Sequence, residues 1–232
     1  MTKLTLIILL SLMPLASAQE LVILLHGLSR TSKSMNKMES HLSAAGFSVL
    51  NLNYPSDQYD IETLSEEALT TATNSPLAQQ CSRIHYVTHS MGGILVRSYY
   101  SRHPIEKVGR VVMLAPPNQG SEVVDNLKDW WLFKRITGPA GGELSTQLTS
   151  TPNRLGPVTF PLGVISGDRS INWINSLMIP GPDDGKVSIE RTKISGMTDH
   201  LILHTTHPFI MKNDTVIQQT LSFLKNGHFL HP

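Results

Sequence analysis

Ser90 stands in a stretch of sequence that can turn a serine into a nucleophile. A short, mostly apolar run at residues 84–89 ends within the motif Thr88-His-Ser-Met-Gly-Gly93. This layout is typical of a nucleophile elbow, a sharp strand-to-helix turn that lifts the hydroxyl to the rim of a sheet and leaves the next backbone N–H, that of Met91, facing an oxyanion. Thr88 stands where the usual G-x-S-x-G pattern has its first glycine, and the second glycine is doubled.

Such a serine needs a base and an acid, and the later part of the chain supplies both. A histidine must accept the hydroxyl proton, and a carboxylate must orient that histidine. Histidines stand at positions 200, 204 and 207, and acidic candidates precede them in Gly167-Asp168 and Asp183-Asp184-Gly185. A serine followed by an acid and then a histidine is one known order of a catalytic triad. The pattern therefore predicts nucleophilic catalysis at Ser90.

The same histidines could instead bind a metal, because histidines four residues apart on a helix can share a zinc ion. The apolar run Leu201-Ile-Leu203 between them favours a strand, in which residues i and i+4 lie about 13 Å apart. That spacing is too wide for one ion. We therefore expect no metal and no cofactor.

The elements that must position these residues alternate along the chain. Apolar runs predict strands at 21–25, 47–52, 84–89, 108–114, 161–165 and 201–203, and helical spacing predicts helices at 35–45, 61–72, 91–102 and 215–224. Strands and helices in alternation predict right-handed crossovers, a mostly parallel sheet and helices on both of its faces.

Residues 129–156 interrupt this alternation with Trp130-Trp-Leu-Phe133, a run rich in Gly and Pro, and Pro152. Long irregular insertions in compact domains are commonly functional. We expect this segment either to line an acyl pocket or form a small lid, or to be an ordinary helix that packs its tryptophans into the core.

The first 18 residues have the pattern of a secretory signal peptide. A positive start is followed by an apolar run from Leu4 to Leu15 and by Ala16-Ser-Ala18, after which we expect cleavage. The apolar run is shorter than the roughly 20 residues of a membrane-spanning helix. We therefore expect a secreted or periplasmic protein in which residues 19–232 form a single domain.

Charge and cysteine content narrow the possible functions. The chain has 19 basic and 18 acidic residues, a balance that gives no electrostatic footprint for nucleic acid or for an anionic membrane surface. Cys81 is the only cysteine, so core packing and not an internal disulfide must hold the fold together.

Taken together, these segments resemble the lipase/esterase branch of the α/β-hydrolase superfamily in its small form. The resemblance rests on Leu21 to Leu28 at the oxyanion loop, on Thr88 to Gly93 at the elbow, and on Val112 to Ser121, which is similar to the segment after the sixth strand of lipases. It implies an α/β protein with a minimal α/β-hydrolase fold of about six strands.

The resemblance also implies roles for individual residues. Ser90 would be the nucleophile, and the backbone N–H groups of Leu28 and Met91 would form the oxyanion hole. His207 lies nearest the closing helix, where the family has its loop histidine, and would be the base. The motif histidines, His26 and His89, are expected to pack the loops.

Two acids remain candidates for the partner of that base. Asp184 lies in Asp-Gly-Lys-Val, which resembles a segment of small secreted lipases, and is the favoured acid. Asp168 follows an apolar strand, as the acid commonly does in the family, and Asp183 is a third option. The carboxylates not used would serve as turn or helix-cap residues.

The expected function is a serine carboxylic-ester hydrolase that works through an acyl-enzyme. An amidase, thioesterase or acyltransferase using the same triad, or a binding protein that keeps only the fold, are the alternatives. The expected partners are a small-molecule ester or lipid substrate and a transient lipid interface, with no nucleic acid, and the protein is expected to be a monomer.

Overall fold

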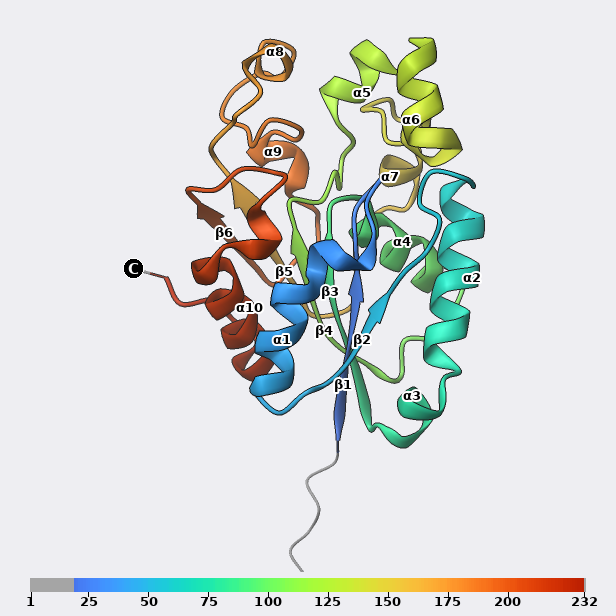
Figure 1. Cartoon of the computed structure of the whole chain (residues 1–232), viewed down its shortest axis with the longest axis vertical. Helices are drawn as coiled ribbons and strands as arrows, with labels where there is room; N and C mark the ends of the chain where they lie inside the picture. Colours follow the sequence, from blue (N-terminus) through green and yellow to red (C-terminus); the bar gives the residue numbers. More distant parts are fainter. Residues whose placement is uncertain (1–18, 232) are drawn as a thin grey trace, which may run out of the picture.

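The computed structural model describes residues 19–231, and its centre is a parallel sheet (Figure 1). Within that range the sheet has six strands in the order β2-β1-β3-β4-β5-β6. The strands are β1 (Glu20–Leu25), β2 (Ser48–Leu52), β3 (Arg83–His89), β4 (Val108–Leu114), β5 (Leu162–Gly167) and β6 (Asp199–Leu203). Every neighbouring pair is parallel. The strand order reverses between β1 and β3, and ligands bind at such a switch point beyond the carboxyl ends of the strands.

Helices cover both faces of the sheet, as the alternation predicted. The longer ones are α1 (Asn36–Ala44), α2 (Ile61–Thr73), α4 (Met91–Tyr100), α6 (Trp131–Gly142) and α10 (Asp214–Asn226). The short ones are α3 (Pro76–Gln80), α5 (Glu122–Leu127), α7 (Thr151–Arg154), α8 (Trp173–Ser176), α9 (Ile189–Thr192) and the 3-10 turns η1 (Ser32–Met35) and η2 (Ile210–Lys212). In Figure 1, α1 and α10 lie on one face, and α2 and α4 lie on the other.

The core is split by the sheet into two apolar layers. In β1, residues 21, 23 and 25 pack with α2 and α4, whereas residues 22 and 24 pack with α1 and α10. Successive side chains of a strand point to opposite faces, so a strand with helices on both sides must be apolar at every position. This confirms the prediction of a parallel sheet from continuous apolar runs.

The segment at 129–156 is more regular than the sequence suggested. It forms α6 and α7, and α6 is kinked at Gly138, where φ is 61° and Pro139 follows. A side chain at Gly138 would collide with the backbone of Asp57, so only glycine fits this kink. Trp130 and Trp131 are 53% and 67% exposed, so the expectation that they pack into the core is wrong. A kinked surface helix was not predicted here, because exposed tryptophans and a Gly-Pro pair within a helix are both unusual.

Arg97 of α4 connects that helix to the end of this segment. Its buried guanidinium donates to the backbone oxygens of Asn118 (2.9 Å), Pro152 (2.8 Å) and Gly156 (2.9 Å). Burial lowers the pKa of Arg97 to about 10, a value at which the group is still charged at neutral pH. The side chain therefore connects α4 to the loop after β4, to Pro152 within α7 and to Gly156 just after α7.

The predicted signal peptide at residues 1–18 lies outside the described part of the chain. Among residues 19–231, no helix combines the length and the apolar character needed to cross a membrane.

Candidate active site

Ser90 sits in a strained turn at the carboxyl end of β3. Its φ is 53° and its ψ is −124°, a conformation that costs a non-glycine residue about 1–3 kcal/mol and that persists only where the surroundings enforce it. Glycines allow the turn to pack closely. A Cβ on Gly92 would lie 2.9 Å from the carbonyl oxygens of Leu25 and His26, and one on Gly27 would lie 3.2 Å from the Cβ of Ser90. The turn and the start of α4 therefore pack directly against the end of β1 and the loop that follows it.

The doubled glycine explains how Thr88 is tolerated at the first position of the elbow. Thr88 is fully buried, and a Cβ on Gly93 would lie 3.2 Å from its Oγ1 and 2.9 Å from Sδ of Met113. The absent side chain at position 93 therefore supplies the room that the usual glycine at position 88 provides. Gly92-Gly93 was visible in the sequence, but its pairing with Thr88 depends on how α4 packs against β3.

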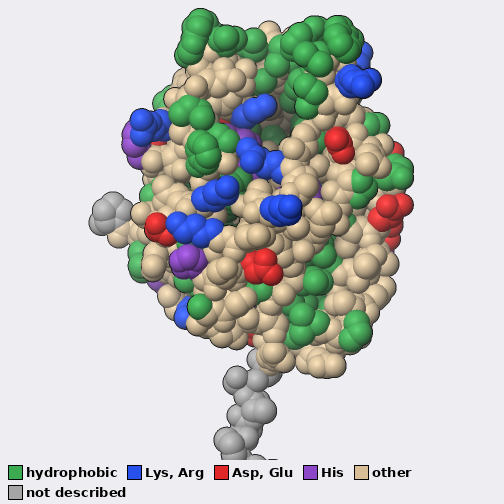
Figure 2. Space-filling view, viewed as in Figure 1, with side chains coloured by type: hydrophobic (Ala, Val, Ile, Leu, Met, Phe, Trp, Pro, Cys, Tyr) green, Lys and Arg blue, Asp and Glu red, His purple; other side chains and the backbone are tan. Residues whose placement is uncertain are grey.

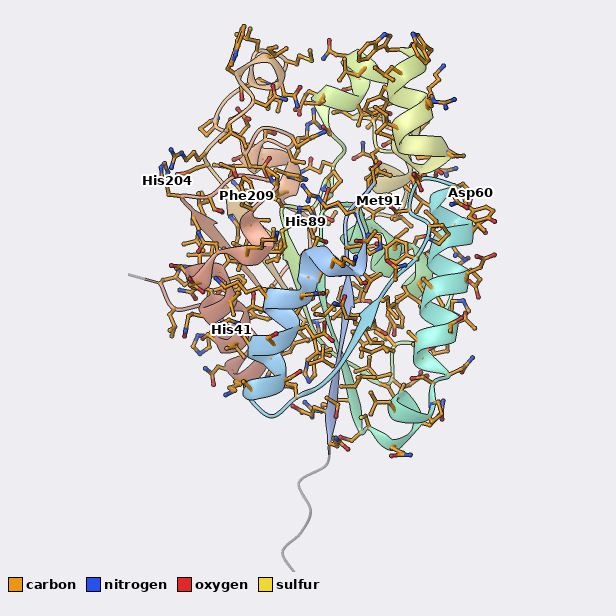
Figure 3. All side chains as sticks on the ribbon, viewed as in Figure 1. His41, Asp60, His89, Met91, His204 and Phe209 are labelled. Atoms are coloured by element: carbon orange, nitrogen blue, oxygen red, sulfur yellow. The ribbon has the colours of Figure 1, made fainter. Side chains whose placement is uncertain are left out.

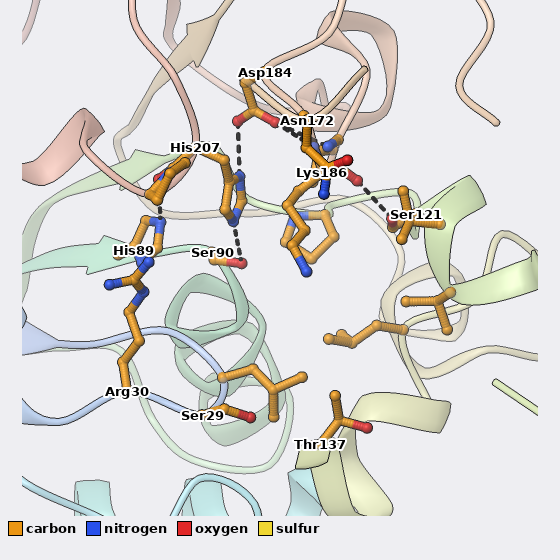
Figure 4. Close-up of a pocket in the computed structure, with 18 of the residues that line it drawn as sticks. Ser29, Arg30, His89, Ser90, Ser121, Thr137, Asn172, Asp184, Lys186 and His207 are labelled. Carbon is orange, nitrogen blue, oxygen red and sulfur yellow. Dashed lines mark hydrogen bonds and ion pairs between the residues drawn. The ribbon is translucent and has the colours of Figure 1, made fainter. Parts of the chain in front are cut away.

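The structure brings His207 between Ser90 and Asp184. His207 Nε2 lies 3.1 Å from Ser90 Oγ, and His207 Nδ1 lies 2.7 Å from Asp184 Oδ2 (Figure 4). A carboxylate only accepts, so Nδ1–H donates to Asp184, and the Nε2 lone pair is left to accept the serine proton. His207 and Asp184 are 7% and 1% exposed, so water competes little for either bond.

The loop around Asp184 satisfies the rest of its charge. Asp184 Oδ1 accepts from the backbone N–H groups of Lys186 at 3.0 Å and Val187 at 2.9 Å. The backbone oxygen of Asp184 accepts from the N–H of His207 at 2.9 Å. The carboxylate is therefore fixed both to its own turn and to the loop that carries the histidine.

The other candidate acids and histidines have partners of their own. Asp168 Oδ1 accepts from Nδ1 of the exposed His204 at 2.9 Å, and Figure 3 places His204 at the edge of the molecule, away from His89 at its centre. Asp183 accepts from the N–H of Gly185 at 2.6 Å, as a turn carboxylate does. The remaining histidine, at position 200, bonds Ser166 Oγ at 2.7 Å through Nε2.

The two backbone N–H groups predicted as oxyanion donors lie at the start of α4 and in the loop after β1. Met91 is the first residue of α4, where an N–H has no intrahelical acceptor and the helix dipole favours negative charge. Leu28 lies in the loop after β1, which Ser29 pins by donating its hydroxyl to the carbonyl of Ile136 at 2.7 Å. Neither the Leu28 nor the Met91 N–H donates to another group within residues 19–231.

A pocket of about 560 Å³ opens above Ser90. One wall comes from the region of α5 and α6 and is apolar. The other side comes from the loops after β1 and β5 and carries charged and polar groups beside apolar residues such as Leu28 and Ile171. The apolar wall consists of Val123, Val124, Phe133, Ile136 and Leu144, and the polar side includes Arg30, Asn172 and Lys186. Residues 129–156 thus line the pocket, one of the roles that the sequence left open, but through Phe133 and Ile136 and not through the tryptophans.

The sequence of residues 21–152 matches the model of the palmitoyl protein thioesterase family. The chain belongs to this family. The matched range includes Leu28, Ser90 and Met91, and it ends before Asp184 and His207. No curated protein matches the chain.

Solved structures of lipases and esterases share the fold of this family member. The mature form of Bacillus licheniformis lipase BlEst2 has a TM-score of 0.71 and 18% identity, over 90% of this chain and 93% of that one. The esterase from Thermogutta terrifontis has a TM-score of 0.63 and 14% identity, over 91% of each chain. Aspergillus fumigatus lipase B has a TM-score of 0.68 and 15% identity, over 90% of this chain and 53% of that one. These likenesses establish the α/β-hydrolase fold.

His89 has a role that the sequence did not reveal. Like His26 it packs in the loops, but its Nε2–H also donates to the carbonyl oxygen of His207 at 3.1 Å, and the two rings lie 4.9 Å apart. Burial, and then the neighbouring His207, hold the pKa of His89 well below its ordinary value. His89 is therefore a neutral donor that helps to fix the backbone of His207.

We expect acid to destabilise the fold through its buried histidines. Burial lowers the pKa of His26, His85 and His89, so below pH 6.5 the unfolded chain binds protons that the folded chain does not. The free energy of unfolding should fall with a slope of up to about 1.4 kcal/mol per pH unit for each such histidine, until the pH reaches its lowered folded pKa.

Urea unfolding at pH 7.5 and pH 5.5 measures this loss. A His89→Gln variant should show a shallower pH dependence than the natural chain, because it lacks one of the histidines whose pKa burial lowers. Equal stability of the natural chain at the two pH values would contradict the prediction.

Proposed function

We propose that this protein is a serine hydrolase that cleaves carboxylic esters through an acyl-enzyme. The observation that carries the proposal is the line of hydrogen bonds from Ser90 Oγ through His207 to Asp184 at the floor of a pocket with an apolar wall. The thioesterase family of the chain, and the lipase and esterase structures that share its fold, support hydrolysis of an acyl bond.

The geometry supports a two-step reaction. Ser90 Oγ attacks the acyl carbon while His207 Nε2 takes its proton, and the Leu28 and Met91 N–H groups stabilise the oxyanion. His207 then gives the proton to the leaving group, which departs and leaves the acyl group on Ser90. Water attacks this acyl-enzyme, its proton passes to His207, and the acid is released as Ser90 regains its proton. Asp184 stabilises the imidazolium in both steps.

A thioester is the second candidate substrate, because the family model is that of palmitoyl protein thioesterases. The same attack and proton transfers serve a thiol leaving group. Rates on p-nitrophenyl esters from acetate to palmitate, compared with thioesters of the same acyl chains, separate the two bond types and give the preferred chain length.

Treatment with a fluorophosphonate tests the proposal most directly. We expect covalent labelling at Ser90, found by peptide mass spectrometry, together with loss of esterase activity. Hydrolysis that persists without labelling and stops with a chelator would indicate a metal hydrolase. Absence of both labelling and turnover would indicate a binding protein.

We also propose a transient lipid surface as a partner. Two apolar tips, on α6 and around α8, flank the pocket, which Ile136 and Ile171 line between them. Trp131 and Trp173 are 67% and 71% exposed on these tips, and Figure 2 shows hydrophobic side chains gathered at this end of the molecule. Tryptophan suits the boundary between water and lipid, and an acyl chain could pass from the surface into the pocket.

Replacing both tryptophans should reduce activity on emulsified long-chain esters. For Trp131→Ser with Trp173→Ser we expect a loss of about tenfold or more, because two large apolar side chains no longer enter the lipid. The rate on a soluble short-chain ester should fall far less. Leu230→Ser, at another exposed apolar position, is the control, and an equal loss in this control would contradict a specific docking face.

We further propose that residues 1–18 are a leader removed on export, that the protein acts outside the cytoplasm, and that it works as a monomer. The mass and amino terminus of the protein recovered from a secreting host test the cleavage after Ala18. Light scattering of the same sample tests the monomer.

A further inference from the structure

Two cationic side chains line the active-site pocket without an acidic partner. Arg30 lies in the loop after β1, and Lys186 lies two residues beyond Asp184. Within residues 19–231, neither side chain forms an ion pair or a hydrogen bond. Some cations outside the pocket do have acidic partners, as Lys37 pairs with Asp214 at 2.7 Å and Arg191 pairs with Glu122 at 3.1 Å.

The pocket itself offers these cations no free counter-charge. Asp184 is the one acidic residue among those that line it, and its oxygens already accept from His207 and from backbone N–H groups. Arg30 and Lys186 both line this pocket, Arg30 beside His89 and Lys186 on the other side of the Ser90 hydroxyl (Figure 4). Burial, and then the positive charge of Arg30, lower the pKa of Lys186, and the charge of Asp184 opposes this shift. Unpaired like charges there favour entry of an anion.

The two cations belong to other segments of the pocket than the apolar wall that would bind the acyl group. The apolar wall comes from α5 and α6, whereas Arg30 and Lys186 come from the loops that also carry the oxyanion donor Leu28 and the acid Asp184. Figure 4 shows Lys186 extending into the pocket from the Asp184 loop, with Thr137 of α6 across from it, and Figure 2 shows Lys and Arg side chains gathered around the hollow. An acyl chain along the apolar wall would direct its leaving group toward these cations.

We propose that the preferred substrate is an acyl ester whose leaving group carries a phosphate, bound by Arg30 and Lys186. The inference rests on the proposed acyl hydrolysis at Ser90. The guanidinium of Arg30 can bind two phosphate oxygens at once, and the ammonium of Lys186 adds a mobile point charge. Because the phosphate stays on the alcohol product, this binding selects the substrate without taking part in the bond that breaks.

A matched pair of soluble substrates tests the preference in the full chain. The pair is 1-lauroylglycerol 3-phosphate and 1-lauroylglycerol, each below its aggregation concentration, which differ only in the phosphate. We expect kcat/KM to be about tenfold or more higher for the phosphate ester. The ratio should fall about tenfold in Arg30→Gln and in Lys186→Gln, and it should fall with added salt.

A ratio of rates remains measurable even if a variant loses part of its activity on both substrates, because a common loss cancels in the ratio. Lys225→Gln removes an exposed cation at the end of α10, outside the pocket, and should keep the ratio of the natural chain. Glycerol 3-phosphate and inorganic phosphate are then added as inhibitors. Inhibition by both indicates that phosphate alone is bound, inhibition by glycerol 3-phosphate only indicates a glycerophosphate headgroup, and inhibition by neither contradicts the proposal.

Two failures are distinguishable. Equal kcat/KM on the two lauroyl esters, or a ratio unchanged in both pocket variants, would overturn the phosphate preference while cleavage of p-nitrophenyl butyrate kept the proposed hydrolase intact. Absence of hydrolysis of every ester, with no fluorophosphonate labelling of Ser90, would overturn both.

Discussion

Ser90→Ala is expected to lower kcat on a p-nitrophenyl ester by about 10⁶-fold, the loss that triad serine hydrolases show without their nucleophile. No other hydroxyl can replace it, because His207 Nε2 lies 3.1 Å from this oxygen and its other ring nitrogen is engaged by Asp184. The residual rate would come from the oxyanion donors and substrate binding alone.

The fold should survive this change. Serine and alanine both carry a Cβ, so the positive φ of 53° at this position strains both alike, and only one hydrogen bond is removed. Circular dichroism and the urea midpoint check folding, and Ser101→Ala, at the exposed end of α4, is the matched control with expected full activity. A Ser90→Ala protein that is folded and keeps most of its turnover would refute the proposed nucleophile.

The sheet was predictable because its four central strands, β1, β3, β4 and β5, are buried on both faces. Such a strand must be apolar at nearly every position, as Leu21 to Leu25 are, and a short apolar run between helical patterns has few other interpretations. The stretch 129–156 lacked any such signal. Its helix α6 continues through a kink that only Gly138 permits, and its tryptophans face solvent, so neither periodicity nor burial marked it as a helix.

The site was less accessible to sequence reasoning than the fold, because it depends on distances between loops. The resemblance favoured Asp184 and His207, but no spacing or periodicity in the sequence determined which of Asp168 and Asp184 meets which of His204 and His207. In the structure, the Asp184 turn bonds to the backbone of His207, while Asp168 meets His204 at the edge. The bond from His89 to the carbonyl of His207 likewise joins residues 118 positions apart.

These pairings lead to an unequal expectation for the two acids. Asp184→Asn should lower kcat by about 10³- to 10⁴-fold, a loss typical of a triad whose acid becomes an amide. The amide can keep an oxygen on the Lys186 and Val187 N–H groups, which fit Oδ1. It would then present its NH₂ group to His207 Nδ1, favour the tautomer with the proton on Nε2, and so remove the lone pair that must accept the serine proton.

Asp168→Asn is the matched control, since it makes the same chemical change one loop away. Asp168 contacts the exposed His204 and not His207, so it is remote from the reaction. A surface substitution of this kind usually changes the free energy of unfolding by no more than about 0.5 kcal/mol, and we expect kcat to change by no more than about threefold. Measuring kcat and KM for both variants with the same ester separates loss of chemistry from loss of binding. A large fall in kcat for Asp168→Asn with little change for Asp184→Asn would mean that the loops rearrange when substrate binds and that Asp168 is the acid.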